Sequence, residues 1–245
     1  MELIMLGTSH GIAEPDRFCS ATLLRVGERL YVFDCGAPVA GLMRRRGLPY
    51  AAIQAVFLTH MHGDHAGGLP GLFDTFTAVM KNGERLPVYF AEEEAIEPFK
   101  AWCYAMHSRG KRLERLDAHT VHPGLVFDDG VVTVEAIPTE HIAYENAPSY
   151  AFYITAEGKR LLLTGDLTED AHDFPAVAFT EEFDVIISEL THFTPSSAVS
   201  IFSRCRTKQL IFHHVRPNTA EEMLPLCPQF PFSTVIANDG DAFTL

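Results

Sequence analysis

The strongest constraint on this chain is the segment Thr59–Gly68, which places three histidines and one aspartate within six residues, directly after the apolar run 53–58. Two histidines at positions i and i+2 on a chain leaving a strand can direct both rings at one point, and the Asp-His pair that follows can reach a second point nearby. Imidazole and carboxylate are the ligands that zinc and similar metals prefer. Two ions about 3.5–4 Å apart can share a bridging hydroxide, a nucleophile near neutral pH. We therefore favour a metal site over a polar surface loop, with the candidate ligands His60, His62, Asp64 and His65.

Length and composition bound the architecture. A chain of 245 residues accommodates one α/β domain or two small ones, and 47% hydrophobic with 21% charged residues is ordinary for a globular protein. No Ser-, Gly- or Pro-rich linker, low-complexity run or repeat of about 20–50 residues interrupts it. We expect residues 1–245 to form a single domain.

Charge, cysteines and apolar runs constrain location and partners. The net charge of −13 disfavours a large nucleic-acid footprint, but a small phosphate ester held by metals remains compatible with it. Five cysteines without a Cys-x-x-Cys pair favour reduced thiols in a cytoplasmic protein over a disulfide framework. No apolar run approaches the roughly 18 residues of a membrane span, and the start lacks the regions of a signal peptide. We expect no membrane partner.

Strands dominate the first part of the chain and alternate with helices later. The expected strands span residues 3–6, 21–26, 29–33, 53–58, 87–90, 131–137, 150–155, 160–163, 184–187, 209–212 and 234–237. The expected helices span residues 39–46, 69–80, 92–107, 196–205 and 220–226. This order favours two packed sheets with helices outside. The stretch 107–128 has no clear pattern, and we interpret His107, His119 and His122 as non-ligands.

Arg44, Arg45 and Arg46 form the only dense basic cluster, at the end of an expected helix. Gly47 and Pro49 end that helix directly afterwards. We interpret the cluster as a solvated helix end, where cations interact favourably with the helix dipole, rather than as a phosphate-binding patch.

Three later strand ends carry further ligand-type side chains. Strand ends are fixed in space, while the loops that follow them can bend toward one another. His141, Asp166 and the pair His213-His214 each follow an expected strand. Together with the first loop they supply imidazoles for two ions, and Asp166 is the natural carboxylate bridge. His213 and His214 are both candidates.

These motifs resemble the metallo-β-lactamase superfamily. The marks are His-x-His-x-Asp-His at 60–65, His141, Thr-Gly-Asp at 164–166 and the late strand-end histidine. Within it, the chain looks most similar to the RNase Z-like branch and its short relatives that hydrolyse cyclic phosphodiesters. The segments that carry this similarity are Leu6–Ser9, Leu30–Gly36 and Thr59–Leu72. The resemblance implies an α/β fold, a four-layer αββα sandwich with a dinuclear metal site at one edge.

The resemblance also implies a ligand set, two divalent ions and an oligomeric state. The first ion would be bound by His60, His62 and His141, the second by Asp64, His65 and His214, and Asp166 would bridge them. The choice of His214 follows the branch's strand-Thr-His pattern, in which His213 takes the Thr place. Zinc is the expected metal and manganese the alternative, and the family suggests a homodimer.

A second set of catalytic residues follows from the same branch, which places a Glu at a late strand end and a His farther on as proton donor to the leaving group. The segment Ser188–Thr194 is similar to a shortened version, with His192 in the place of the acid. A departing alkoxide needs a proton, and imidazole has a suitable pKa. The expected catalytic residues are Asp64, which also orients the attacking hydroxide, and His192.

Two departures from the branch concern the substrate. Residues 81–128 have room for a helix and a short hairpin, but contain no Gly-rich basic arm such as tRNA-processing members carry. The Cys-rich zinc insert of some phosphodiesterase relatives is missing as well. We therefore expect hydrolysis of a small phosphodiester through a metal-bridging hydroxide, rather than tRNA processing.

Other functions are compatible with the same centre. A thioester or lactone hydrolase is the alternative enzyme, although an acid such as His192 favours the phosphodiester because thiolates hardly need protonation. A non-catalytic metal-binding member is the alternative of another class, and the intact ligand set argues against it. A flavin-dependent oxidoreductase is disfavoured because we find no second domain.

Overall fold

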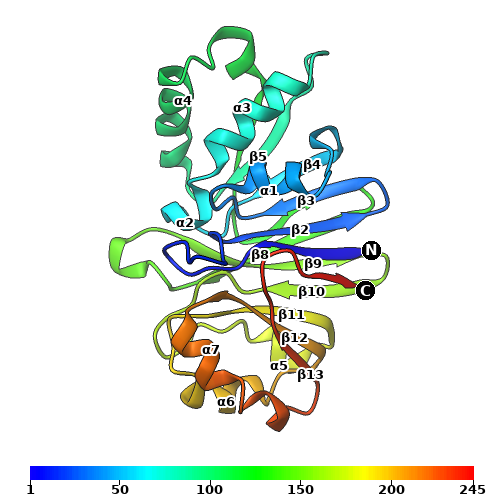
Figure 1. Ribbon diagram of the computed structural model, residues 1–245, viewed down its shortest axis with the longest axis vertical. Helices are drawn as coiled ribbons and strands as arrows, with labels where there is room; N and C mark the ends of the chain where they lie inside the picture. Colours follow the sequence, from blue (N-terminus) through cyan, green and yellow to red (C-terminus); the bar gives the residue numbers. More distant parts are fainter.

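In the computed structural model, which describes residues 1–245, fourteen strands form two seven-stranded sheets (Figure 1). The first contains, in spatial order, β14 (Ala242–Thr244), β1 (Glu2–Gly7), β2 (Ala21–Val26), β3 (Arg29–Phe33), β4 (Ile53–Phe57), β5 (Leu86–Phe90) and β6 (Leu116–Thr120). The second contains β13 (Ser233–Ile236), β12 (Thr207–Val215), β11 (Phe183–Leu190), β10 (Lys159–Leu163), β9 (Ser149–Ala156), β8 (Val132–Thr139) and β7 (Gly124–Asp128).

Helices cover the outer face of each sheet (Figure 1). The first sheet is covered by α1 (Val39–Arg45), α3 (Leu69–Val79) and α4 (Ile96–Ala105). The second is covered by α5 (Val177–Thr180), α6 (Pro195–Phe202) and α7 (Pro217–Met223). None of the helices combines the length and the hydropathy that crossing a membrane requires. The predicted αββα sandwich is therefore confirmed.

Aromatic residues hold the two sheets together. Phe33 and Phe57 lie on neighbouring strands of the first sheet with ring centroids 5.1 Å apart, and Phe152 of the second sheet lies 5.9 Å from each. All three are almost completely buried, so each contributes about 1.5–3 kcal/mol of hydrophobic stabilisation. This packing fixes the two sheets relative to each other and, with them, the loops that follow the strands.

One edge of the sandwich collects the carboxyl ends of the strands that matter for function. β3 and β4 are parallel, and so are β10, β11 and β12. β8 and β10 are both antiparallel to β9, so β8 also ends at this edge. Parallel strands present the residues that follow them at a common edge, where ligand sites of α/β sheets form. The residues brought to this edge are Asp34, His60, His141, Asp166, Glu189 and His214.

The structure corrects several sequence-based expectations. Residues 107–128 contain β6 and β7, which lie in different sheets, so the short hairpin considered for residues 81–128 does not form. Neither strand shows a clean alternation of buried and exposed residues, because nearly all of their residues are half-exposed or exposed. The helix expected over 92–107 is α-helical only from Ile96 to Ala105, and Pro98 occupies its first turn, where proline is tolerated. A short strand, β14, follows the expected last strand and pairs with β1.

Candidate metal centre

The loop after β4 forms the floor of the site. His60 follows the strand, and the single-turn helix α2 (Gly63–Ala66) carries the Asp64 and His65 side chains. The turn packs closely on the segment after β3, because a Cβ on Gly36 would lie 2.3 Å from the carbonyl oxygen of Asp64. Only glycine permits this approach. The local fold therefore brings His60 and His65 into the buried interior of the site.

The first group of ligand-type side chains consists of His60, His62, His141 and Asp166, whose ligand atoms all lie within 4.8 Å of one another. Nδ1 of His62 lies 3.0 Å from Nε2 of His60 and 3.3 Å from Nε2 of His141. Oδ2 of Asp166 lies 3.7 Å from Nε2 of His60 and 3.6 Å from Nε2 of His141. Tetrahedral ligands about 2.0–2.1 Å from zinc are separated from one another by roughly 3.3 Å.

The second group consists of Asp64, His65, Asp166 and His214, again within 4.8 Å of one another. Nε2 of His65 lies 3.3 Å from Oδ2 of Asp64 and 3.3 Å from Oδ1 of Asp166. Nε2 of His214 lies 3.3 Å from Oδ2 of Asp166. Asp166 therefore contributes one carboxylate oxygen to each group, with Oδ2 also close to His214.

Two observations show that these residues fit divalent cations. Nε2 of His65 and Oδ1 of Asp166 are buried and accept or donate no hydrogen bond. Buried polar atoms without a partner are rare, because each costs about 1–3 kcal/mol. The donor set of imidazole nitrogens and carboxylate oxygens is also the one that zinc and manganese accept in proteins.

In three of the histidines, a hydrogen bond on the far side of the ring fixes which nitrogen faces the cluster. Nδ1 of His65 lies 2.7 Å from Oδ2 of Asp34, and Nδ1 of His214 lies 2.7 Å from Oγ of Ser20. Nδ1 of His141 donates to the carbonyl oxygen of residue 167 at 3.1 Å. Such outer contacts orient ligating rings and set their tautomer. Sequence reasoning missed Asp34 and Ser20 as members of the site.

The structure separates His214 from His213. β11 and β12 pair residue 189 with His213 and residue 190 with Val215, so His214 is the extra residue of a β-bulge. It has φ +49°, in the left-handed region that non-glycine residues rarely adopt. A bulge re-aims a side chain, and here it turns His214 into the cluster. His213 is buried, does not join either group and leaves both ring nitrogens without a partner.

Burial controls the charge of most histidines in the cluster. Burial lowers the pKa of His60 well below its ordinary value and lowers that of His62 as well. It also lowers the pKa of His214 to about 3. Neutral imidazole is the form that ligates a metal, so these rings are ready to bind at neutral pH.

His65 is the exception, because it lies between carboxylates. Burial acts to lower the pKa of His65, but the charges of Asp166 and Asp34 raise it well above its ordinary value. Burial acts to raise the pKa of Asp166, but the neighbouring His214 and His65 bring it well below its ordinary value. The carboxylates at the centre of the site therefore favour a positive charge. In the metal-free protein, protonation of His65 provides this charge.

A third group links the metal cluster to the predicted acid. Nδ1 of His192 lies 2.9 Å from Oε1 of Glu189 and 3.8 Å from Oδ2 of Asp166. Glu189 is fully buried and accepts further hydrogen bonds from the backbone N–H groups of Leu167, Thr191 and His192. Burial acts to lower the pKa of His192, but Glu189 raises it to about 9. His192 is 29% exposed at its side chain, and its Nε2 makes no hydrogen bond.

A cavity of about 390 Å³ opens above the cluster. Its lining includes the loop residues His10 and Ile12, some members of each predicted ligand group, His192 and Arg216. The Arg216 side chain is exposed and makes no hydrogen bond or ion pair. Sequence reasoning did not select His10, Ile12 or Arg216, because their loops meet the cluster only in the folded chain. His107, His119 and His122 lie in none of the three groups.

Comparisons with known proteins agree with this geometry. A family model described as "Anti-Pycsar protein Apyc1" matches residues 1–213. Ribonuclease Z of a Picosynechococcus species is 35% identical over 143 residues, which are 58% of this chain and 44% of that relative. The matched region thus spans less than half the length of that curated relative.

The fold is similar to several solved structures. The short form of human tRNase Z has a TM-score of 0.77 at 23% identity, with 100% of this chain and 99% of that chain covered. The metallo-β-lactamase fold protein YhfI from Bacillus subtilis has a TM-score of 0.78 at 21% identity, with 99% of each chain covered. A diphosphatase of the PhnP family has a TM-score of 0.74 at 19% identity, with 100% and 97% covered.

Fold and site together define the metallo-β-lactamase class, in its RNase Z-like branch. The chain belongs to the Apyc1 family, whose model covers most of its length. The superfamily and the branch predicted from the sequence are confirmed. The roles of the individual ligands and of His192 remain predictions.

Proposed function

We propose that this protein is a hydrolase that cleaves a small phosphodiester with the help of two divalent cations, zinc or manganese. Residues 1–245 would act as one catalytic domain. One ion would be held by His60, His62 and His141, the other by Asp64, His65 and His214, with Asp166 shared. The crowding of these side chains and the unpartnered atoms of His65 and Asp166 support this assignment.

Cations bound there would polarise a phosphoryl oxygen and make bound water acidic. The protein itself supplies orientation and proton transfer. Asp64, at the mouth of the cluster, has an oxygen 3.3 Å from Nε2 of His65 and lines the cavity, so it can orient a water molecule toward a bound substrate. Arg216 offers free N–H donors to the non-bridging oxygens of an anionic ester.

The contact between His192 and Glu189 is the observation that carries the proposal. Glu189 fixes Nδ1 of His192 and leaves Nε2 free on the cavity side. An imidazolium held in this way can donate a proton to an alkoxide as it departs, which is worth about 10²–10⁴ in rate. A thiolate needs little such assistance, so this arrangement favours a phosphodiester over a thioester.

Three observations support a small substrate. A cavity of about 390 Å³ is in the range of small-ligand sites. Residues 81–128 form α4 and strands of both sheets rather than an extended arm. The net charge of −13 also opposes a long polyanion. The names of the relatives do not decide the size of the substrate. Ribonuclease Z indicates RNA, and the diphosphatase indicates a smaller substrate.

The test is hydrolysis of bis(p-nitrophenyl) phosphate by metal-stripped protein reloaded separately with zinc and with manganese. Metal-dependent turnover supports the proposal, and the Asp64→Ala variant should lose at least about 10³-fold in kcat while remaining folded by circular dichroism. No turnover with two ions bound per chain would favour the thioester or lactone hydrolase. No metal binding would contradict the proposal and favour a non-catalytic binding protein that keeps the fold.

A further inference from the structure

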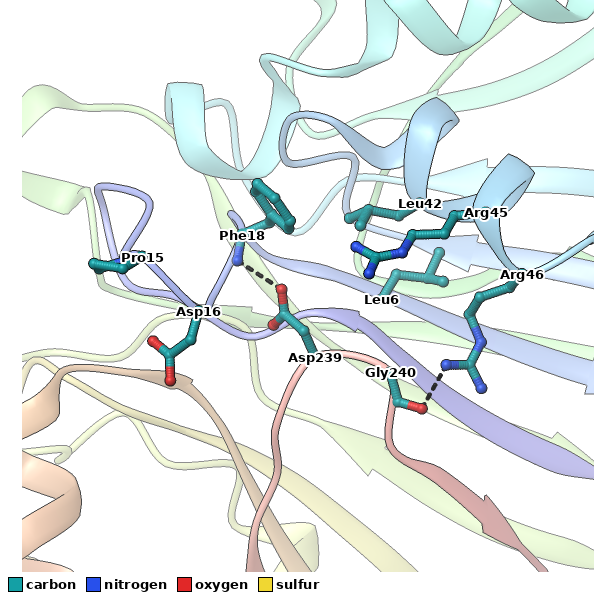
Figure 2. A pocket seen from close by; sticks show the side chains of 9 residues that line it. All are labelled: Leu6, Pro15, Asp16, Phe18, Leu42, Arg45, Arg46, Asp239 and Gly240. Atoms are coloured by element: carbon teal, nitrogen blue, oxygen red, sulfur yellow. Dashed lines mark hydrogen bonds between the residues drawn. The ribbon is translucent and has the colours of Figure 1, made fainter.

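A second cavity, of about 580 Å³, is bordered by Pro15, Asp16 and Phe18 (Figure 2), which belong to the loop whose residues His10 and Ile12 line the metal pocket. Its floor is apolar and is formed by Leu6 of β1 and Leu42 of α1, with Phe18 on one wall. Arg45 and Arg46, at the end of α1, form the opposite wall. None of these residues takes part in the metal cluster.

The guanidinium groups of Arg45 and Arg46 have N–H donors without a hydrogen-bond partner. Arg45 makes no hydrogen bond and no ion pair, and in Figure 2 its side chain reaches over Leu6 toward Phe18. Arg46 donates from Nη1 to the carbonyl oxygen of Gly240 at 2.6 Å and makes no ion pair. Guanidinium groups bind oxyanions through paired N–H donors, and Arg45 and Arg46 line the same cavity, so both can contact one doubly charged group.

The carboxylates of the cavity do not neutralise these arginines. Asp239 already accepts hydrogen bonds from N and Oγ1 of Thr8, both at 2.7 Å, and from N of Phe18 at 2.6 Å. Asp16 is exposed, and its carboxylate points away from the guanidinium of Arg45 in Figure 2. The free positive charge therefore faces an apolar floor, which suits an anion that carries an apolar or aromatic body.

We propose that this cavity binds an organic phosphate monoester, with the phosphate on Arg45 and Arg46 and the organic body over Leu6, Leu42 and Phe18. Phosphate monoesters carry two negative charges near neutral pH, which match the arginine wall, and an organic group, which matches the apolar floor. The arginines do lie exposed at the end of α1, as the sequence predicted, and the proposal adds a binding role to that position.

Binding in this cavity acts on the metal pocket, because one loop borders both. His10 and Ile12 of the loop line the metal pocket, whereas Phe18 lines the second cavity. Asp239 ties the two ends of the loop together through its hydrogen bonds to Thr8 and Phe18. This step rests on the proposed function, since a phosphate monoester is the product class of phosphodiester hydrolysis, and the site then senses product.

The binding test is a calorimetric titration of the metal-loaded protein with phenyl phosphate. The wild type should bind at two sites, one at the metals and one at the arginines. Arg45→Gln should weaken the second site about 10–100-fold, the loss expected for charge-assisted hydrogen bonds. Arg44→Gln is the matched control, because Arg44 lies on the same helix, makes no ion pair and does not line the cavity.

Two further ligands measure separately what the arginine wall and the apolar floor contribute to binding. Inorganic phosphate and benzyl alcohol should each bind the second site at least about tenfold more weakly than phenyl phosphate. Identical titrations of wild type and Arg45→Gln would overturn the site. Equal affinity for inorganic phosphate would overturn the role of the organic body.

The kinetic test measures hydrolysis of bis(p-nitrophenyl) phosphate at increasing phenyl phosphate. Phenyl phosphate that competes with substrate at the metals should inhibit the wild type and Arg45→Gln equally. An additional inhibition or activation that is seen in the wild type and Arg44→Gln, but not in Arg45→Gln, supports the coupling of the two cavities through the loop. Equal kinetics in all three proteins would overturn that link. Should no turnover exist at all, the proposed function fails, while the titration still decides whether the cavity binds its ligand.

Discussion

Nδ1 of His65 lies 2.7 Å from Oδ2 of Asp34, and both side chains are shielded from solvent. Asp34 follows β3 and His65 follows β4, so the parallel pairing of these strands creates the contact. The other oxygen of Asp34 accepts from N of Thr59 at 2.8 Å, which fixes the carboxylate in turn. Asp34 therefore holds His65 in one tautomer, with Nε2 directed at the metal cluster.

Replacing Asp34 by Asn should weaken metal binding about 10–100-fold, because the amide keeps the acceptor shape but no longer supports a positively polarised His65 ring. Competition of the loaded protein with a chelator measures this affinity. Asp129→Asn is the control, since Asp129 bonds Tyr31 and Arg29 away from the cluster. Metal affinities that agree within about twofold between the Asp34 variant and the wild type would show that Asp34 serves folding alone.

The strands were largely predictable because their signals are local. The pair β2 and β3 has the predicted bounds, Ala21–Val26 and Arg29–Phe33, since a glycine turn separates two apolar runs. β6 escaped prediction because its side chains are mostly half-exposed, so hydrophobic alternation is weak. It is a strand because it pairs with β5 at the edge of the sheet. This pairing is a tertiary contact, which the hydrophobic periodicity of the sequence does not reveal.

The ligand-type residues were also predictable, because their spacing is a local signal. The residues that hydrogen-bond to them and orient them were not predictable. The spacing of His60 to His65 carries chemical information within a few residues. Ser20 has no such signal, because it reaches His214 across 194 positions of the chain. The choice between the late histidines depends on a bulge opposite β11, and a single sequence does not show where strand pairing slips.

His192→Ala should slow hydrolysis of diphenyl phosphate about 10²–10⁴-fold and that of bis(p-nitrophenyl) phosphate less than about tenfold. Nitrophenolate is the better leaving group and depends less on a proton donor. The measurement is kcat for both substrates in the same metal-loaded protein. His119→Ala is a suitable control, because His119 stacks on Tyr89 outside the cavity. Equal losses on both substrates would remove the proton-donor role.

Arg216→Gln should raise KM for bis(p-nitrophenyl) phosphate about tenfold and change kcat less, since its free guanidinium binds the ester's negative charge. The neutral ester p-nitrophenyl acetate, if turned over, should show no such dependence. Arg204→Gln is the control, because Arg204 lies over the Phe179 ring, away from the cavity. An unchanged KM in the Arg216 variant would argue against direct contact with substrate.

Asp129 gives the chain a pH-dependent contribution to stability. Burial acts to raise the pKa of Asp129, but hydrogen bonds from the backbone N–H of Val132 and from Tyr31 and Arg29 lower it. A carboxyl group with a lowered folded-state pKa stabilises the fold fully above its unfolded-state pKa of about 4, and this stabilisation is lost as pH falls through the folded-state value. Stability from this group is therefore greatest at neutral pH.

Asp129→Asn should reduce the free energy of unfolding by about 1–3 kcal/mol at pH 7, and the difference from wild type should shrink below about pH 4. Urea unfolding of both proteins across this range measures the difference. Asp16→Asn is the matched control, because Asp16 is exposed and makes no hydrogen bond, and its unfolding free energy should follow the wild type at every pH. A difference for Asp129→Asn that stays constant down to about pH 2.5 would mean that shape rather than charge of the side chain stabilises the fold, because protonation of the carboxylate would then have removed nothing.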